Sequence, residues 1–157
     1  MKQESLNSTD QCSVSAGKYI SAIYRHMQII ISARLEPYRI GSGQYIFLIT
    51  ISQSEGISQK ALSEELLIDK TTTAKAVAKL EAEGYIRRET DPADNRYNKL
   101  YLTQSGQAVV PKIRDVLQQV REQSRIGIDD QEYEMMLTLL RKVLCNVSEQ
   151  VRSGVKS

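Results

Sequence analysis

The sequence has few of the residues on which most catalytic and metal sites depend. It contains one histidine and two cysteines, and no CxxC or Cys/His pair brings metal ligands together. Paired-carboxylate motifs, a nucleophile elbow and a glycine-rich phosphate loop are also missing. We therefore expect no metal, no cofactor and no enzymatic activity, although Asp, Glu or Tyr can in principle act as general acids and bases.

Two cysteines are too few for a disulfide framework. Cys145 follows Leu140 and Leu144 on an apolar segment, so we expect a buried structural thiol there. Cys12 lies in a polar tail with no basic residue close in sequence to activate it, which disfavours a reactive role.

Long apolar runs and a strong net charge are absent as well. No run approaches the roughly 20 apolar residues that span a bilayer, and residues 1–15 lack the apolar segment of a signal peptide. We therefore expect a cytoplasmic protein without a membrane partner. The composition, 41% hydrophobic and 25% charged, is typical of a globular domain. A net charge of +2 does not identify a polyanionic partner, so the placement of charges must decide that question.

Amphipathic patterns occur at both ends of the chain. Apolar residues spaced three or four apart from Val14 to Leu35 predict a long helix that Pro37 ends. Two further helices are predicted from apolar stripes at 109–120 and 133–151, with Asp129 or Asp130 as the cap of the second. The spacing near 3.5 residues indicates that these helices pair with other helices, and the partner helices can belong to the same chain or to the second chain of a dimer.

Residues 44–52, QYIFLITIS, have two interpretations. Their β-branched content favours a strand. Tyr45, Leu48 and Ile49 also fit one face of a helix, for which Ser42 is available as a cap. The local pattern alone favours the strand.

Residues 56–86 predict two short helices joined by a tight turn. Ser58 is the expected cap of the first helix and Asp69 that of the second, which Gly84 ends. The inward stripes are expected to be Ala61, Leu62 and Leu66 in the first helix, and Thr73, Ala76, Val77 and Leu80 in the second. Alternating strands on either side of a turn at 91–94 follow, so the pattern is a helix-turn-helix with a hairpin, or winged helix.

The outward face of the second short helix is suited to nucleic acid. It presents Lys70, Thr71, Thr72, Lys75 and Lys79. Lysines reach guanine or phosphate, and threonines offer a hydroxyl and a methyl group to base edges in the major groove. The alternative is a solvated face that only maintains solubility.

The hairpin tip favours the nucleic-acid interpretation. Arg96 lies beside Asn95, and Asp94 can accept hydrogen bonds from its guanidinium and orient it. The narrow minor groove has a negative potential that attracts such a guanidinium. An exposed surface ion pair of little energetic value is the alternative.

Residues 58–106 resemble the winged-helix core of MarR-family transcription regulators. The most specific part is Asp94-x-Arg96-x-x-x-Leu100-x-Leu102-Thr103 with Gly106 after it, preceded by LEAEGYIRR at 80–88. The resemblance implies a mainly α fold with a small β-hairpin wing, in which a winged helix-turn-helix core at 37–103 is flanked by long dimerisation helices. These helices fall at 13–36 and 104–157, after a flexible tail at 1–12, and 44–52 becomes a helix.

The resemblance also implies a function. A homodimer would place two winged helices on a pseudo-palindromic operator in double-stranded DNA, most commonly as a repressor. The recognition-helix role falls on the five outward residues, and the wing role on Arg96 with Asp94 as its support. Phosphate contacts fall on Ser58, Gln59 and Lys60. The alternative is a winged-helix module for protein contact, which would lack salt-sensitive affinity for duplex DNA.

Many members of the resembling family sense a small phenolic or aromatic compound in a crevice between the dimerisation helices and the winged core. The candidate residues by location are Tyr19, Tyr24, His26, Tyr38 and Tyr45. Packing in the core or at an interface is the alternative for each. The cysteine of peroxide-sensing members would align near Gly17, so Cys12 does not match it.

Overall fold

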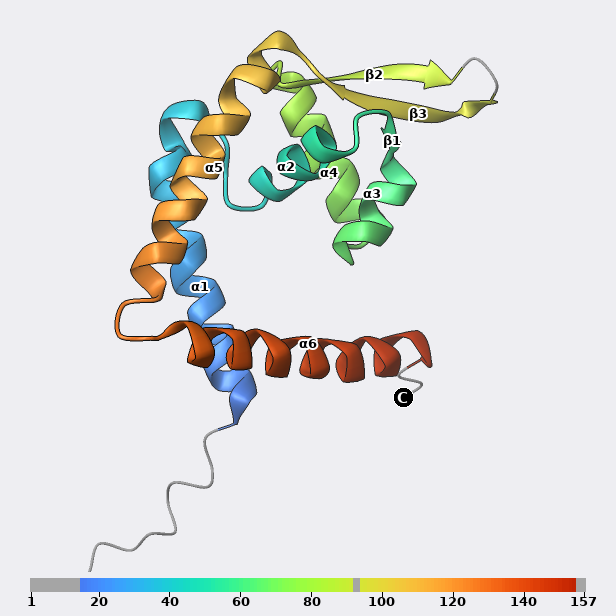
Figure 1. The fold of residues 1–157 in the computed structure, drawn as a ribbon. Helices are drawn as coiled ribbons and strands as arrows, with labels where there is room; N and C mark the ends of the chain where they lie inside the picture. Colours follow the sequence, from blue (N-terminus) through green and yellow to red (C-terminus); the bar gives the residue numbers. More distant parts are fainter. Residues whose placement is uncertain (1–14, 92–93, 155–157) are drawn as a thin grey trace, which may run out of the picture. The chain divides into compact units, whose positions relative to one another are not determined.

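The computed structural model describes residues 15–91 and 94–154, without the side chains of 91–97. The chain divides into two compact units, Met1–Val120 and Arg121–Ser157. The first contains a bundle of helices and a small sheet, and the second consists mainly of one long helix (Figure 1). The predicted mainly α fold with a β-hairpin wing is confirmed. No helix within the described ranges combines the length and hydrophobicity that a bilayer crossing needs.

Helix α1, Ala16–Leu35, ends where the sequence predicts. A single 3-10 turn, η2 (Glu36–Tyr38), follows at Pro37 because proline lacks the N–H that would continue the α-helix. Arg39 then takes a left-handed backbone conformation with φ 54°, and its N–H donates to the Glu36 carbonyl at 2.8 Å. This strained residue turns the chain sharply toward the next helix.

Residues Tyr45–Gln53 form helix α2, so the strand favoured by local composition is wrong and the helix implied by the resemblance is confirmed. Five consecutive residues, Phe47–Ile51, are buried. A helix that is buried on all sides shows no helical periodicity, and its apolar run resembles a strand. The predicted Ser42 cap is also wrong, since Gln44 is the N-cap residue and the Ser42 N–H donates to Ser32 Oγ at 3.2 Å.

The helix-turn-helix consists of α3, Gln59–Leu66, and α4, Lys70–Ala82. Ser58 caps α3 as predicted, because its Oγ accepts from the Ala61 N–H at 3.1 Å. Ala61 was expected to face inward but is exposed, and Ser63 is buried beside Leu62 instead.

Gly84 ends α4 as predicted, and the structure shows a Schellman motif around it. The Tyr85 N–H donates to the Leu80 carbonyl at 2.9 Å and the Gly84 N–H donates to Glu81 at 3.0 Å. Gly84 has φ 78°, a conformation that glycine adopts without steric cost. The motif turns the chain directly into the wing.

The sheet has the order β1-β3-β2 and is antiparallel throughout. Its strands are β1 (Ile57–Ser58), β2 (Ile86–Asp91) and β3 (Asp94–Leu102). The register pairs Ile86 with Leu102 and Arg88 with Leu100. Because side chains alternate along a strand, this face carries the buried Ile86, Leu100 and Leu102, and the other face points outward.

Gly106 allows the wing to join helix α5, Gln104–Ser124. A Cβ atom built on Gly106 would lie 2.1 Å from the Tyr85 carbonyl oxygen, so only glycine fits there. Thr103 secures the same junction: its Oγ1 donates to the Gly84 carbonyl at 2.6 Å and accepts from the Gly106 N–H at 3.1 Å. The resemblance motif Leu-x-Leu-Thr-x-x-Gly therefore has a structural cause.

One hydrophobic core organises the first unit. It joins Leu35 of α1, Phe47 of α2 and Leu62 of α3 with Val77 of α4 and Ile113 of α5. Each of these side chains is at most 1% exposed. Since α1 and α5 share this core with the winged helix, the predicted boundaries at 36/37 and 103/104 do not coincide with a break in packing, and they stay a prediction.

Helix α6, Asp130–Arg152, differs from all the others because none of its residues is buried. Asp129 closes a capping box with Glu132 at its start. Cys145 is exposed, so the expected buried thiol is wrong. Its apolar neighbours Leu140 and Leu144 are exposed as well, so the single chain offers nothing on α6 that would bury the thiol. Cys12 lies outside the described residues.

Candidate nucleic-acid interface

Helix α4 separates its two faces cleanly. The residues that anchor it to the core are Thr73, Ala76, Val77 and Leu80, all at most 4% exposed, as the sequence predicts. The side chains expected to meet DNA are all exposed: Lys70, Thr71, Thr72, Lys75 and Lys79. The core contacts therefore fix which side of α4 faces outward, and that side is hydroxyl-rich and cationic.

The first turn of α4 is held by Asp69. Its Oδ1 accepts from the Thr72 N–H at 2.8 Å, and its Oδ2 accepts from the Thr72 hydroxyl at 2.6 Å. These hydrogen bonds hold the pKa of Asp69 below its ordinary value, and the one from the Thr72 hydroxyl has the largest effect. Because the Thr72 hydroxyl donates its hydrogen to Asp69, what it offers to a base is an acceptor oxygen and a methyl group.

The three residues expected to contact phosphate lie together at the start of α3, but each has a partner in the chain. Ser58 Oγ caps the helix, and Gln59 Oε1 accepts from Arg88 Nη1 at 3.4 Å. Lys60 Nζ lies 3.9 Å from Glu64 Oε1. This ion pair is exposed on both sides and therefore weak, so Lys60 can leave it for a phosphate at little cost.

Arg88 is a residue that the sequence analysis did not single out. Its Nε donates to Glu81 Oε2 at 2.9 Å while its Nη1 reaches Gln59. One side chain therefore connects α3, α4 and β2, the three elements that would have to keep their relative positions on DNA. The strand alternation in GYIRR could have indicated it, because Arg88 falls on the same face as Ile86.

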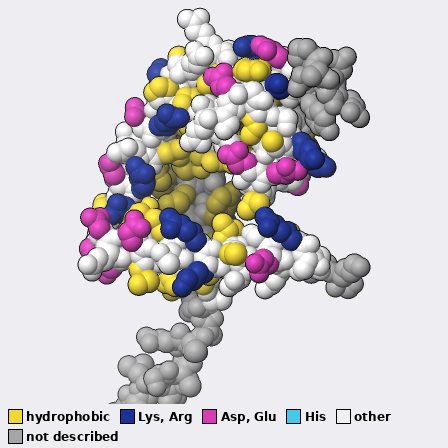
Figure 2. All heavy atoms as spheres, turned by 45° about the vertical axis from the view of Figure 1, so that its right-hand side comes forward, with side chains coloured by type: hydrophobic (Ala, Val, Ile, Leu, Met, Phe, Trp, Pro, Cys, Tyr) yellow, Lys and Arg dark blue, Asp and Glu magenta, His cyan; other side chains and the backbone are white. Residues whose placement is uncertain are grey.

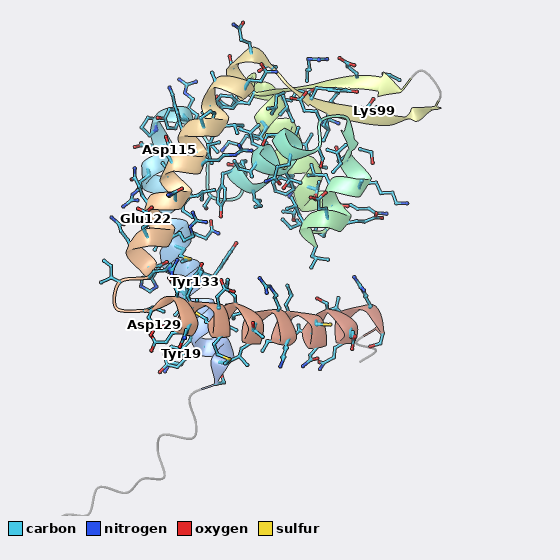
Figure 3. The ribbon with its side chains drawn as sticks, viewed as in Figure 1. Tyr19, Lys99, Asp115, Glu122, Asp129 and Tyr133 are labelled. Carbon is cyan, nitrogen blue, oxygen red and sulfur yellow. The ribbon has the colours of Figure 1, made fainter. Side chains whose placement is uncertain are left out.

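The outer face of the wing carries further cations. Arg87 lies over the Tyr101 ring with its guanidinium carbon 5.0 Å from the centroid, and it pairs with Glu89. Lys99 projects from β3 opposite Glu89 (Figure 3). The period of two in the strands could have identified Arg87 and Lys99 as neighbours on one face.

The predicted wing tip is described only in part. Asp94, Asn95 and Arg96 belong to the start of β3. Their side chains lie outside the described residues, so the roles assigned to them remain predictions.

The five candidate effector residues do not form one group. Tyr24 and Tyr45 are neighbours: burial raises the pKa of the Tyr45 phenol, the nearby Tyr24 phenol raises it further, and a hydrogen bond with Gln28 opposes both. Tyr38 has other partners, since its carbonyl accepts from the Tyr85 hydroxyl at 2.7 Å and Lys112 Nζ lies 5.4 Å from its ring centroid.

Tyr19 is exposed on α1 (Figure 3), and His26 is exposed on the same helix. His26 Nδ1 lies 2.8 Å from the Ala22 carbonyl oxygen, an ordinary contact within one helix. Across the part of the chain that the structure describes, no three His, Cys, Asp or Glu side chains are grouped so as to hold a metal ion.

Comparison with known proteins gives a consistent result. The profile of the MarR family matches residues 40–97. The HTH-type transcriptional regulator YybA of Bacillus subtilis (strain 168), itself uncharacterized, is 31% identical over 140 residues, which are 87% of this chain and 93% of YybA.

Solved structures agree with this match. A MarR transcriptional regulator from Methanosarcina mazei Go1 is 38% identical with a TM-score of 0.77, over 85% of this chain and 97% of that one. A MarR-family regulator from Listeria monocytogenes, solved in complex with a 26mer DNA, is 26% identical with a TM-score of 0.84, over 92% of this chain and 98% of that one.

Proposed function

This chain belongs to the MarR family of transcriptional regulators, which are not enzymes, and on that premise we propose that it acts as a dimeric repressor on double-stranded DNA. Helix α4 of each protomer enters the major groove of a pseudo-palindromic operator, and the wing places Arg96 in the adjacent minor groove. A small aromatic or phenolic effector relieves the repression. The regulator acts in the cytoplasm, where the operator DNA lies.

One observation carries this proposal: α4 is anchored by a buried stripe and presents lysine and threonine side chains, with the small Ala78 among them, on the opposite face. An α-helix fits the major groove, and its N-terminal residues contact base edges in helix-turn-helix proteins. Lys70, Thr71 and Thr72 occupy that N-terminal turn, while Lys75 and Lys79 follow along the same face. The Listeria relative crystallised with DNA supports the same use of the fold.

Dimerisation is supported by apolar surface that a single chain leaves uncovered. On α6, side chains that are 38–69% exposed include Met135, Met136, Leu139, Leu140, Val143, Leu144, Val147 and Val151. Hydrophobic side chains reach the surface among charged ones along this helix (Figure 2). Tyr19, Ile20 and Ile23 of α1 are similarly exposed. Apolar faces of this extent on monomers mark interaction sites, and a second copy has matching faces to cover them.

Effector binding is supported by a polar group between α1 and α2. The Gln28 side chain hydrogen-bonds to the Tyr45 hydroxyl, which interacts with the Tyr24 phenol, whereas the buried Gln28 Oε1 accepts no hydrogen bond from the described residues. An unsatisfied buried acceptor costs about 1–3 kcal/mol. A phenolic hydroxyl is a suitable donor for it, and the tyrosine rings provide aromatic contact area. We expect Gln28→Leu to lower the affinity for such a compound without changing operator affinity.

The deciding experiment measures binding of the full-length protein to its own upstream DNA at several salt concentrations, with a random duplex of equal length as control. We expect tight, salt-sensitive binding to the upstream DNA alone. If neither duplex binds even at low salt, the regulator proposal fails and the winged-helix module for protein contact takes its place.

The same assay tests the wing. Arg96→Ala should weaken specific binding by about 1–3 kcal/mol if the guanidinium enters a groove. An unchanged affinity would remove Arg96 from the interface, while the role of α4 would stand.

A further inference from the structure

A polar cleft lies between the end of α1, the turn after η2 and the last turns of α4. Its volume is about 490 Å³, and its lining includes Glu36, Arg39, Ile40, Lys79 and Glu83. This volume falls in the range of small-molecule sites, although the cleft is shallow and open to solvent, so a ligand would be held mainly by its charged groups. None of the candidate effector residues lines it, so the cleft is separate from the group formed by Gln28 and the two tyrosines.

The lining of the cleft carries two charges of each sign. Arg39 and Lys79 are cationic, and Glu36 and Glu83 are anionic. The Arg39 side chain is 81% exposed, and its Nη1 lies 3.9 Å from Glu83 Oε2. This separation is too long for a strong hydrogen-bonded pair, so a carboxylate from solution that binds the guanidinium through two hydrogen bonds can displace Glu83.

The backbone holds these groups in place without a ligand. Arg39 has φ 54°, and its N–H donates to the Glu36 carbonyl, which fixes the direction in which the Arg39 side chain leaves the backbone. The Tyr85 hydroxyl ties Tyr38 to the end of α4 at 2.7 Å. Ile40, only 2% exposed, provides an apolar contact at the base of the polar groups. Strained backbone of this kind collects at ligand sites.

We propose that this cleft binds a small amino-carboxylate, a molecule with an ammonium group and a carboxylate group on a short apolar body. Its carboxylate pairs with Arg39 and Lys79, and its ammonium pairs with Glu36 and with the Glu83 that Arg39 releases. A simple anion would leave both glutamates unmatched, and a simple amine would leave both cations unmatched. Since Lys79 also belongs to the proposed DNA face, an occupied cleft competes with DNA for this side chain; that consequence rests on the proposed function.

Leucine and two analogues test the ligand class. 4-Methylpentanoate is leucine without the ammonium group, and 3-methylbutylamine is leucine without the carboxylate. Each is titrated into the isotope-labelled full-length protein without DNA, and backbone amide shifts are followed by NMR. We expect saturable shifts with leucine at residues 36–41 and 79–83, and at least about tenfold weaker binding of either analogue, because each lacks one set of charge-assisted hydrogen bonds. No saturation with leucine, or equal binding of an analogue, overturns the proposal.

Matched variants test the residues. Lys79→Ala should weaken leucine binding about tenfold through the loss of one charge-assisted contact. Lys75→Ala removes the same charge one turn earlier on α4, outside the cleft lining, and should bind leucine like the unmodified protein. Equal affinities for both variants would exclude the cleft. Because DNA is absent from this assay, leucine binding by a protein that fails to bind operator would uphold the site and refute only the regulator function.

Discussion

Helices α4 and α6 have the same kind of N-terminal cap but differ in how far their side chains are buried. Each has an aspartate cap whose side chain accepts a backbone N–H, Asp69 in α4 and Asp129 in α6. Each also carries an apolar stripe. Yet four residues of α4 are buried, whereas none of α6 is. Caps therefore define where these helices start, and the surroundings decide what they do.

The contrast separates two kinds of surface. The stripe of α4 is covered by its own chain, so its exposed face is polar and available to a soluble partner such as DNA. The exposed face of α6 includes large apolar side chains, which water solvates poorly. The apolar stripe of α4 is thus covered within the single chain, whereas that of α6 is left exposed. The following variants test that distinction.

The largest expected effect is at the junction that fixes the end of α4. Gly106→Ala would bring a Cβ to 2.1 Å from the Tyr85 carbonyl oxygen, and a backbone atom cannot move aside as a flexible side chain does. We expect a loss of about 3 kcal/mol in the free energy of unfolding, at the upper end for overpacking. Urea denaturation measures it, with Gly43→Ala as control, since a Cβ on Gly43 meets nothing within 4 Å. Equal stability of the two variants would contradict the geometry of this junction.

The next effect concerns α6. Leu144 is 56% exposed in the single chain, so Leu144→Glu should leave an isolated chain intact. If a second copy covers the stripe, the substitution should weaken association by about 2 kcal/mol, or roughly thirtyfold in Kd. Sedimentation equilibrium measures the change.

A control on the same helix separates charge from position. Thr138 is exposed and lies on the side of α6 opposite the apolar stripe that contains Leu144. Thr138→Glu therefore adds the same carboxylate outside that stripe. We expect it to dimerise normally. If both glutamate variants associate like the unmodified protein, α6 does not provide the dimer contact.

Local chemistry explains why much of the winged helix could be predicted. Ser58, Asp69 and Gly84 act within four residues of their own positions, so their signals are complete in the sequence. The buried stripe of α4 has a clear helical period because only one side is covered. The same reasoning failed for residues 47–51, where burial on all sides removed the period.

Contacts between distant residues could not be predicted in this way. The Arg88 network joins α3 and α4 to β2, and the cleft brings Arg39 together with Glu83. The period of the strand places Arg88 on the inward face, but it does not reveal which residues of other elements the side chain meets there. The error at Cys145 is of another kind: its sequence neighbours are apolar, but no residue of α6 is buried, so those neighbours do not shield it.

A smaller effect depends on pH. Because hydrogen bonds with Thr72 lower the pKa of Asp69 in the folded state, its ionised carboxylate stabilises α4 above the ordinary carboxyl value of 3.8. That stabilisation is lost as the pH falls through the lowered pKa. Asp69→Asn should therefore lower Tm at neutral pH, and the gap to the unmodified protein should close in acid. Thermal unfolding between neutral and strongly acidic pH measures it, and a gap independent of pH would show that the charge has no part.

The smallest effect compares one lysine from each helix. Lys75 of α4 and Lys142 of α6 are both exposed, and alanine favours a helix, so neither substitution should change stability appreciably. Lys75→Ala should reduce the slope of log affinity against log salt by about one if Lys75 contacts a phosphate. Lys142→Ala should leave the slope unchanged, because the exposed face of α6 is assigned to association. Equal slopes for the two variants would remove Lys75 from the phosphate contacts, and a reduced slope for Lys142→Ala would mean that α6 also meets DNA.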